Sequence, residues 1–211
     1  MRSAIIATAI VIGSIATGPD VMAQSQDRMP PIAADKLTDA QKKAIEEFKA
    51  ARSAEVSGPF IPLLRSPEVM SRARAMGDYL RFRSVLPPRL SEFVILLTAR
   101  QWTQNYEWNA HAALARQAGV SPDVIAAIAD GRRPEKMTED EDILYTFCDE
   151  LTKTHAVSDG TYARVVGKFG EQGVVDTVGI TGYYTLLAMM LNTARTPLPG
   201  NAKPQLSPLT R

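Results

Sequence analysis

Apolar residues recur every three or four positions along most of this 211-residue chain, the spacing of one face of an α-helix. No segment shows the sustained alternation of apolar and polar residues that is typical of a half-buried strand. The densest apolar pattern belongs to one predicted helix, at Leu90, Phe93, Val94, Ile95, Leu96, Leu97 and Trp102. This stripe is too wide for a surface helix, so we expect this helix to be buried on most sides. The pattern predicts an all-α fold.

Local signals mark where the predicted helices begin and end. Thr38 with Gln41 and Thr138 with Glu141 each have the spacing of a capping box, and Gly119 is a C-terminal stop. With their caps, the predicted helices span about 38–53, 66–83, 87–102, 105–118, 121–129, 138–155, 158–169 and 174–193.

The chain divides into a helical region and two polar ends. Residues 24–37 are expected to form an extended arm, and residues 201–211 a tail within a proline-rich segment that starts at Pro197. Residues 38–200 then form a single-domain helical bundle, with a loop predicted at 57–62.

Residues 1–23 have the pattern of a secretory signal peptide. Arg2 provides a short basic start, an apolar stretch covers 4–15, and Val21 and Ala23 are small residues at the −3 and −1 positions of a cleavage site. The apolar stretch is short for a membrane span of about 20 residues, although an uncleaved anchor stays open. We expect an exported, periplasmic protein with no stable membrane insertion after the leader is removed.

Composition narrows the function classes. Lys and Arg number 24 and Asp and Glu 23, and no basic run occurs, so nucleic acid is not an expected partner. Without the leader, 211 − 23 = 188 residues remain, enough for one substantial core. The one cysteine, Cys148, cannot form an intramolecular disulfide. It is either a redox thiol or, as its apolar neighbours favour, a small buried core residue.

The candidate chemistry lies at Glu107 and His111, which are four residues apart and therefore share one face of a helix. Glu92 precedes them, in the apolar helix. A carboxylate beside an imidazole can transfer protons without a metal or a cysteine. The alternative is that His111 is a hydrogen-bonded histidine with a purely structural role.

Five segments in order resemble the carboxymuconolactone decarboxylase family. LPPRLSEFVILL at 86–97 resembles the opening of the active-site helix in that family, and YEWNAH at 106–111 is similar to its E-W-x-x-H signature. AGVS at 118–121, VGITGYY at 178–184 and PLP at 197–199 fit the rest of the pattern. The resemblance covers about residues 36–200.

This resemblance implies an alkylhydroperoxidase D-like helical bundle that assembles into homotrimers or hexamers, with active sites near subunit boundaries. One branch of the family is a cofactor-free decarboxylase, and the other uses a C-x-x-C pair between a Glu and a His. Gln104 and Glu107 stand where those two cysteines belong. Disulfide exchange needs thiolates, so the dithiol peroxidase mechanism is disfavoured.

The resemblance also suggests roles for individual residues. His111 would deliver a proton to carbon after decarboxylation, because imidazole gains and loses protons near neutrality. Glu107 would orient the ring and favour its charged form, and Glu92 would share the proton from the neighbouring helix. Arg100 would anchor a substrate carboxylate, unless it is simply a solvated helix arginine. Trp108 and Tyr183 are the other candidate substrate-binding residues.

Several alternatives stay open. The same residue types serve a hydrolase, a hydratase or an isomerase of a lactone or enol. Glu92, Glu107 and His111 could also make a three-ligand metal set, but we expect no metal and no organic cofactor. Protocatechuate breakdown is cytoplasmic, so an exported member would act on a different small molecule. A non-catalytic exported binding protein is a further possibility.

Overall fold

The computed structural model describes residues 26–209, and these residues contain eight α-helices and no strand. The predicted signal peptide at 1–23 lies outside the described residues. The helices are α1 (Asp39–Arg52), α2 (Phe60–Leu63), α3 (Pro67–Phe82), α4 (Pro88–Gln101), α5 (Asn105–Gln117), α6 (Pro122–Ala129), α7 (Glu139–Thr154) and α8 (Asp159–Ala194). Two short 3-10 turns, at Ala34–Lys36 and Pro199–Asn201, flank them. The all-α prediction is confirmed.

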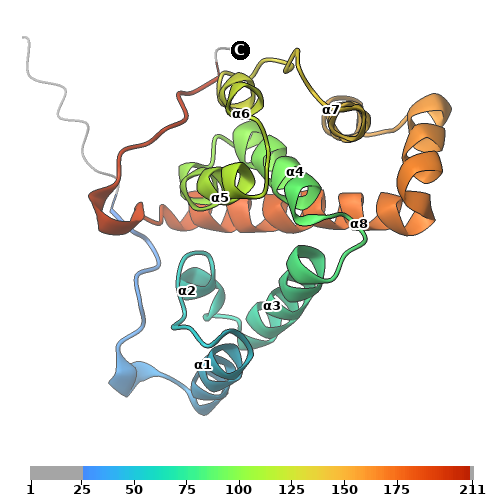
Figure 1. Cartoon of the computed structure of the whole chain (residues 1–211). Coiled ribbons are helices and arrows are strands. Elements are labelled where there is room, and N and C mark those ends of the chain that lie inside the picture. Colours follow the sequence, from blue (N-terminus) through green and yellow to red (C-terminus); the bar gives the residue numbers. More distant parts are fainter. Residues whose placement is uncertain (1–25, 210–211) are drawn as a thin grey trace, which may run out of the picture.

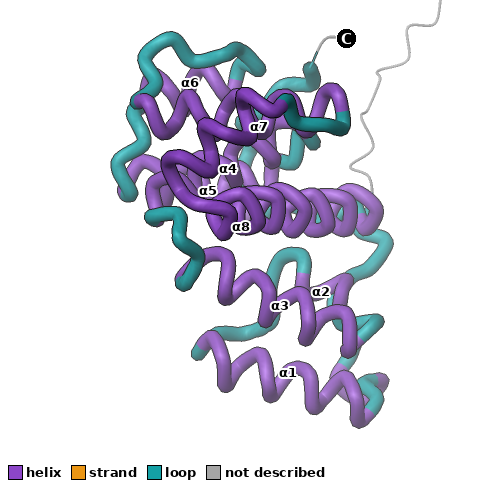
Figure 2. The backbone as a smooth tube through the Cα atoms, turned by 90° about the vertical axis from the view of Figure 1, so that its right-hand side faces the viewer, coloured by secondary structure: helices purple, strands orange, loops and turns teal. Residues whose placement is uncertain are grey.

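The long helix α8 runs through the middle of the molecule and separates two groups of helices (Figure 1). On one side lie α1, α2 and α3, and on the other lie α4 to α7 (Figure 2). Helix α4 packs against α5, α7 and α8, and α3 packs against both α4 and α8. Because α4 is surrounded in this way, ten of its fourteen residues are buried, as its apolar pattern predicted.

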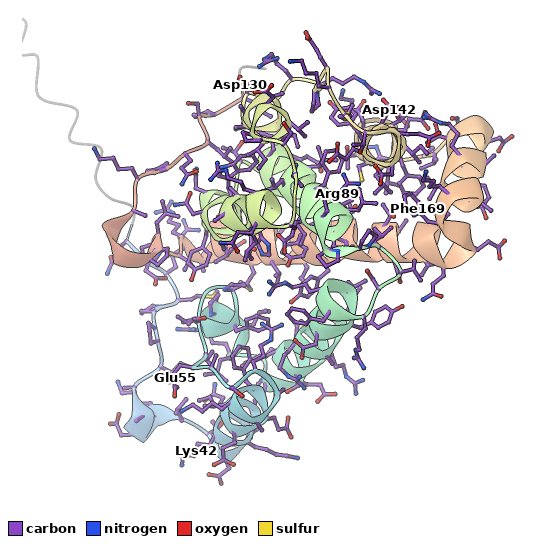
Figure 3. All side chains as sticks on the ribbon, in the orientation of Figure 1. Lys42, Glu55, Arg89, Asp130, Asp142 and Phe169 are labelled. Atoms are coloured by element: carbon purple, nitrogen blue, oxygen red, sulfur yellow. The ribbon has the colours of Figure 1, made fainter. Side chains whose placement is uncertain are left out.

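Both predicted capping boxes are present. Thr38 Oγ1 accepts from the Gln41 backbone N–H at 3.3 Å, and the Gln41 side chain accepts from the Thr38 N–H at 3.0 Å. The box at Thr138 and Glu141 starts α7. Figure 3 shows Arg89 on α4 beside α7, and its guanidinium donates to Asp140 and Glu141, each at 2.6 Å. The start of α7 is therefore tied to the start of α4.

Two predicted boundaries differ from the structure. Residues 57–62 were expected to form a loop, but Phe60–Leu63 is a short helix that packs Phe60 on Phe48 with ring centroids 4.9 Å apart. Pro62 fits there because a first helical turn does not need its N–H. The helices predicted at 158–169 and 174–193 are joined into α8, with a break at Gly170, where φ is +71°. Only glycine adopts that backbone conformation easily.

Helix α8 is a core helix with a polar anchor. By length and apolarity it is the one helix among residues 26–209 that could cross a membrane, yet half of its most apolar window is buried in the protein. Asp176 on α8 is buried and accepts from the Tyr79 hydroxyl at 3.2 Å and from the Val85 N–H at 2.9 Å. These bonds hold α3 and the segment leading into α4 against α8.

Residues 202–209 of the tail form no helix and lie against the bundle. Asn105 Oδ1 accepts from the backbone N–H groups of Gln205 and Leu206, each at 2.8 Å. Leu206 is buried, and Leu209 contacts Gly131 after α6. The tail therefore covers one side of α5 and α6.

Candidate functional site

The candidate site lies where α3, α4, α5 and α8 meet. Gln104 is the N-cap of α5 and accepts from the Tyr106 N–H at 2.7 Å, which starts the helix so that Glu107 and His111 fall one turn apart on its buried face. Glu92 reaches the same point from α4, and Tyr184 from α8. The structure thus brings together the three residues that the sequence analysis selected as catalytic.

The imidazole of His111 has an acidic partner at each of its two nitrogens. Its Nδ1 lies 2.6 Å from Glu92 Oε2, and its Nε2 lies 3.6 Å from Glu107 Oε2. The Tyr184 hydroxyl lies 3.3 Å from the same Nε2. An ionised Glu92 can only accept a hydrogen bond, so this geometry places a proton on Nδ1. Nε2, with its longer contacts, is the nitrogen free to exchange a proton.

Burial makes both the acid and the phenol in this cluster hard to ionise. Glu107 is 4% exposed and its Oε1 has no hydrogen-bond partner among the described residues. Desolvation raises the pKa of Glu107, although the nearby His111 and Arg81 oppose the rise. Burial also raises the pKa of Tyr184 well above its usual value. Burial therefore favours the protonated forms of Glu107 and Tyr184 beside His111, and such groups can take part in general acid–base chemistry.

Arg81 is a member of the site that the sequence analysis missed. It comes from the last turn of α3, and its Nη2 lies 4.0 Å from Glu92 Oε1. Among the lysines and arginines of residues 26–209, only Arg81 lies within salt-bridge distance of Glu92 or Glu107. Its Nε is buried without a partner in this part of the chain. No sequence signal identifies Arg81, because its contact with α4 depends on how α3 packs.

Arg81 also lines a surface cleft, whereas Glu92, Glu107 and His111 are not among the residues that line it. His111 is only 5% exposed, so its ring is nearly closed off within one chain. This cleft, of about 480 Å³, lies between the end of α1 and the end of α3. Its lining includes Arg52, Asp78, Arg81 and Phe82. Arg81 therefore touches both the cleft and the Glu92 carboxylate.

The other predicted site residues lie in different surroundings. Arg100 is two turns beyond Glu92 on α4, roughly 12 Å along the helix axis, and donates instead to the Ala129 carbonyl at 3.2 Å and the Ser207 carbonyl at 2.9 Å. Trp108 is buried in the core. Tyr183 is buried beside Tyr184, with ring centroids 5.2 Å apart, and burial raises its pKa to about 12. The structure does not bring Arg100 to the His111 cluster.

Neither a thiol pair nor a metal cage is found among the described residues. Cys148, the one cysteine in the chain, is buried, and desolvation raises its pKa to about 12. No group of three or more His, Cys, Asp or Glu residues in 26–209 could hold a metal ion. Glu92 and Glu107 approach opposite nitrogens of His111, so these three side chains do not converge on one point.

Fold and site together describe a helical protein in which Glu92, Glu107 and His111 form a cluster of acidic groups around an imidazole, and no pair of thiols lies there. Residues 67–136 match the model of the carboxymuconolactone decarboxylase family. This part of the chain is therefore similar to a carboxymuconolactone decarboxylase family domain, and the full sequence, with one cysteine, has no C-x-x-C pair. No curated protein matches the sequence.

Three solved structures share the fold. A peroxidase-related protein with an alkylhydroperoxidase AhpD core, from Ralstonia eutropha JMP134, has a TM-score of 0.62 at 19% identity over 79% of this chain and 88% of that one. A protein of unknown function from Agrobacterium tumefaciens, linked to AhpD-type antioxidant defence, has a TM-score of 0.58 at 19% identity over 65% and 94%. A cysteine-to-alanine variant of the debrominase Bmp8, bound to 2,3,4-tribromopyrrole, has a TM-score of 0.63 at 8% identity over 84% and 94%. At these identities the likeness shows the fold alone.

Proposed function

We propose that this protein is a cofactor-independent, decarboxylase-like lyase that acts on a small lactone or carboxylated enol. The observation that carries the proposal is the position of His111, whose two ring nitrogens face two different carboxylates. Glu92 at 2.6 Å fixes the tautomer and orientation of the ring, and Nε2 on the other side exchanges the proton.

The proposed reaction needs no co-reactant beyond a proton. The substrate enters through the cleft beside Arg81, whose guanidinium attracts an anionic substrate. When the bond to the carboxylate breaks, carbon dioxide leaves and the electron pair moves toward the carbonyl oxygen as an enolate. The Tyr184 hydroxyl stays protonated and supplies a hydrogen-bond donor near Nε2 of His111. Protonated His111 then delivers its proton to carbon, and solvent restores it.

A hydrolase or an isomerase of a related small molecule would use the same groups. The burial of His111 favours a further candidate, an exported binding protein in which the cluster is structural. A dithiol peroxidase is disfavoured because Gln104 and Glu107 occupy the thiol positions and the thiol of Cys148 stays protonated near neutral pH.

We also propose that the protein is a homo-oligomer, a trimer or hexamer, formed through α8. Val175, Val178, Leu186 and Met189 are exposed apolar residues spaced along one face of this helix. Gly182 continues the same face, and a Cβ there would meet no atom within 4 Å. A stripe without charged residues is typical of a surface that a second copy covers.

The proposed location is outside the cytoplasm. The support is the leader pattern at 1–23, with its basic start, apolar stretch and small residues before the cleavage point. An exported enzyme meets different metabolites from a cytoplasmic decarboxylase, so the substrate is expected to differ from that of the protocatechuate pathway.

The test is a screen of the purified mature protein against lactones and carboxylated enols, with carbon dioxide release and proton uptake measured separately. A lyase shows both in equal amounts, whereas a hydrolase or isomerase releases no carbon dioxide. His111→Ala should abolish turnover and leave the oligomer intact. His155→Asn is the matched control, because it removes the other histidine and asparagine tolerates the left-handed backbone there, with φ +59°. Full activity in His111→Ala would refute the role given to this ring.

A further inference from the structure

A second cleft lies on the far side of α4 from the α1–α3 group, between α4, α6, α7 and the tail. It has a volume of about 190 Å³, and its lining includes Arg100, Ile128, Tyr145, Cys148 and Leu209. An apolar cavity of about 150 Å³ admits a benzene ring, so this cleft has room for a small ring or a short chain. Figure 1 shows the tail running past α6 on this side of the molecule.

Arg100 brings a buried positive charge to this cleft. It is 4% exposed, and its three hydrogen bonds go to neutral oxygens: the carbonyls of Ala129 and Ser207 and the hydroxyl of Thr103. A guanidinium has five N–H donors, so two remain, one of them on the buried Nε, which has no partner in residues 26–209. Asp130 favours the charged form of Arg100, but it pairs directly with Arg132, and no carboxylate in the described part of the chain lies within salt-bridge distance of Arg100. A buried cation without a direct carboxylate partner is costly, so its environment favours an added anion.

The other cations that line the cleft are already paired. Lys153 lies 2.7 Å from Asp149, and Arg132 lies 3.0 Å from Asp130, and both pairs are exposed or half-exposed. Arg100 is therefore the cation with free donors. The rest of the lining mixes aliphatic and aromatic side chains with threonines, Gln101 and Asp149, which is the partner of Lys153, and Leu209 from the tail closes one side.

We propose that this cleft is a binding site for a small apolar monocarboxylate, whose carboxylate pairs with Arg100 and whose apolar body lies between Ile128, Tyr145 and Leu209. The planar guanidinium suits the two oxygens of a carboxylate. The tail holds the ligand in place, because Ser207 bonds to Arg100 and Leu209 covers Gly131. This site is separate from the His111 cluster and does not depend on the chemistry proposed there.

The test is isothermal titration calorimetry of the mature protein with benzoate, and with benzamide as the neutral analogue. Benzoate is expected to bind with one site per chain and about tenfold or more tightly than benzamide. Arg100→Gln should weaken benzoate by a similar factor, whereas Arg132→Gln, which removes an exposed and paired cation of the same cleft, should leave it nearly unchanged.

A second variant keeps the test decisive if Arg100→Gln does not fold. Thr152 is half-buried, lines the cleft, and its hydroxyl bonds only to carbonyls of its own helix, so Thr152→Phe fills the space with little loss elsewhere. It should abolish benzoate binding. The proposal is overturned if no binding heat appears up to about 10 mM benzoate, if benzamide binds equally well, or if Thr152→Phe binds like the wild type. Loss of binding in Arg81→Gln, with Arg100→Gln unaffected, would place benzoate at the other site and also overturn it.

Discussion

Replacing Glu107 by glutamine should make the protein more stable while it removes activity. Glu107 is 4% exposed, its Oε1 has no partner among the described residues, and its Oε2 has only a 3.6 Å contact with His111 Nε2. Glutamine keeps the shape of the side chain and still leaves a polar atom unpaired, but it cannot ionise and so never carries a buried charge. We therefore expect the free energy of unfolding at pH 7 to rise by about 1.4 kcal/mol for each unit by which burial raises the pKa of Glu107.

The stability gained in Glu107→Gln should depend on pH, and it should be larger at higher pH. Because burial raises the pKa of Glu107 above its usual 4.5, the folded protein holds this proton more tightly than the unfolded chain does. The wild type therefore loses stability as the pH rises from about 4.5 to the folded pKa of this residue, and it keeps that stability below 4.5. The advantage of the variant should grow over the same range and vanish at lower pH.

The assay is urea unfolding followed by circular dichroism, at several pH values and at two protein concentrations to control for assembly. For an m-value of about 1–3 kcal/mol per molar, each gain of about 1.4 kcal/mol should raise the midpoint at pH 7 by roughly 0.5–1.4 M. Glu141→Gln is the matched control, because Glu141 is 2% exposed but lies 2.6 Å from Arg89. It should lose about 1–3 kcal/mol. A less stable Glu107→Gln, or a gain that does not change with pH, would refute the reasoning.

Four further predictions test other parts of the molecule. Cys148→Ser should keep full turnover, and neither form should consume peroxide, because burial holds the thiol pKa at about 12. Val178→Glu should dissociate the proposed oligomer in size-exclusion chromatography with light scattering, since it puts a charge on the apolar face of α8. Gly77→Ala should lower stability by about 1–3 kcal/mol, because its Cβ would overlap a buried tyrosine ring, whereas Gly167→Ala, with open space around it, should gain about 1 kcal/mol. Intact mass of the protein from a periplasmic extract should show cleavage after Ala23.

Local chemistry explains why most helix boundaries could be predicted. A capping box involves residues three apart, so Thr38 with Gln41 is visible in the sequence and needs no knowledge of the fold. The short helix at Phe60–Leu63 was not predicted, because four residues with a proline have no helical period to detect. It forms because Phe60 finds Phe48, far away along the chain.

In the site, contacts within one helix could be predicted from the spacing in the sequence, whereas contacts between helices could not. Glu107 and His111 share a helix face, so their approach follows from spacing alone. Glu92 lies nineteen residues before His111, and the resemblance to a family suggested it. Arg81 could not be predicted, because it reaches Glu92 only through the packing of α3 on α4. Arg100 was predicted as a substrate anchor of this site, yet its position on α4 directs it to another cleft.

Arg81 belongs to α3, which packs against α4 and α8, the helices that contribute Glu92 and Tyr184 to the His111 cluster. Helices α1 and α3 pack on each other, and α3 rests on α8 through close contacts at Gly77 and Gly179. If this pair of helices swings outward, the ring becomes accessible and the positive charge leaves in the same motion. The entry of a small molecule would then be coupled to the charge around His111. In the open state Glu92 and Glu107 would lack a nearby cation, and only in the closed state would Arg81 offset their negative charge.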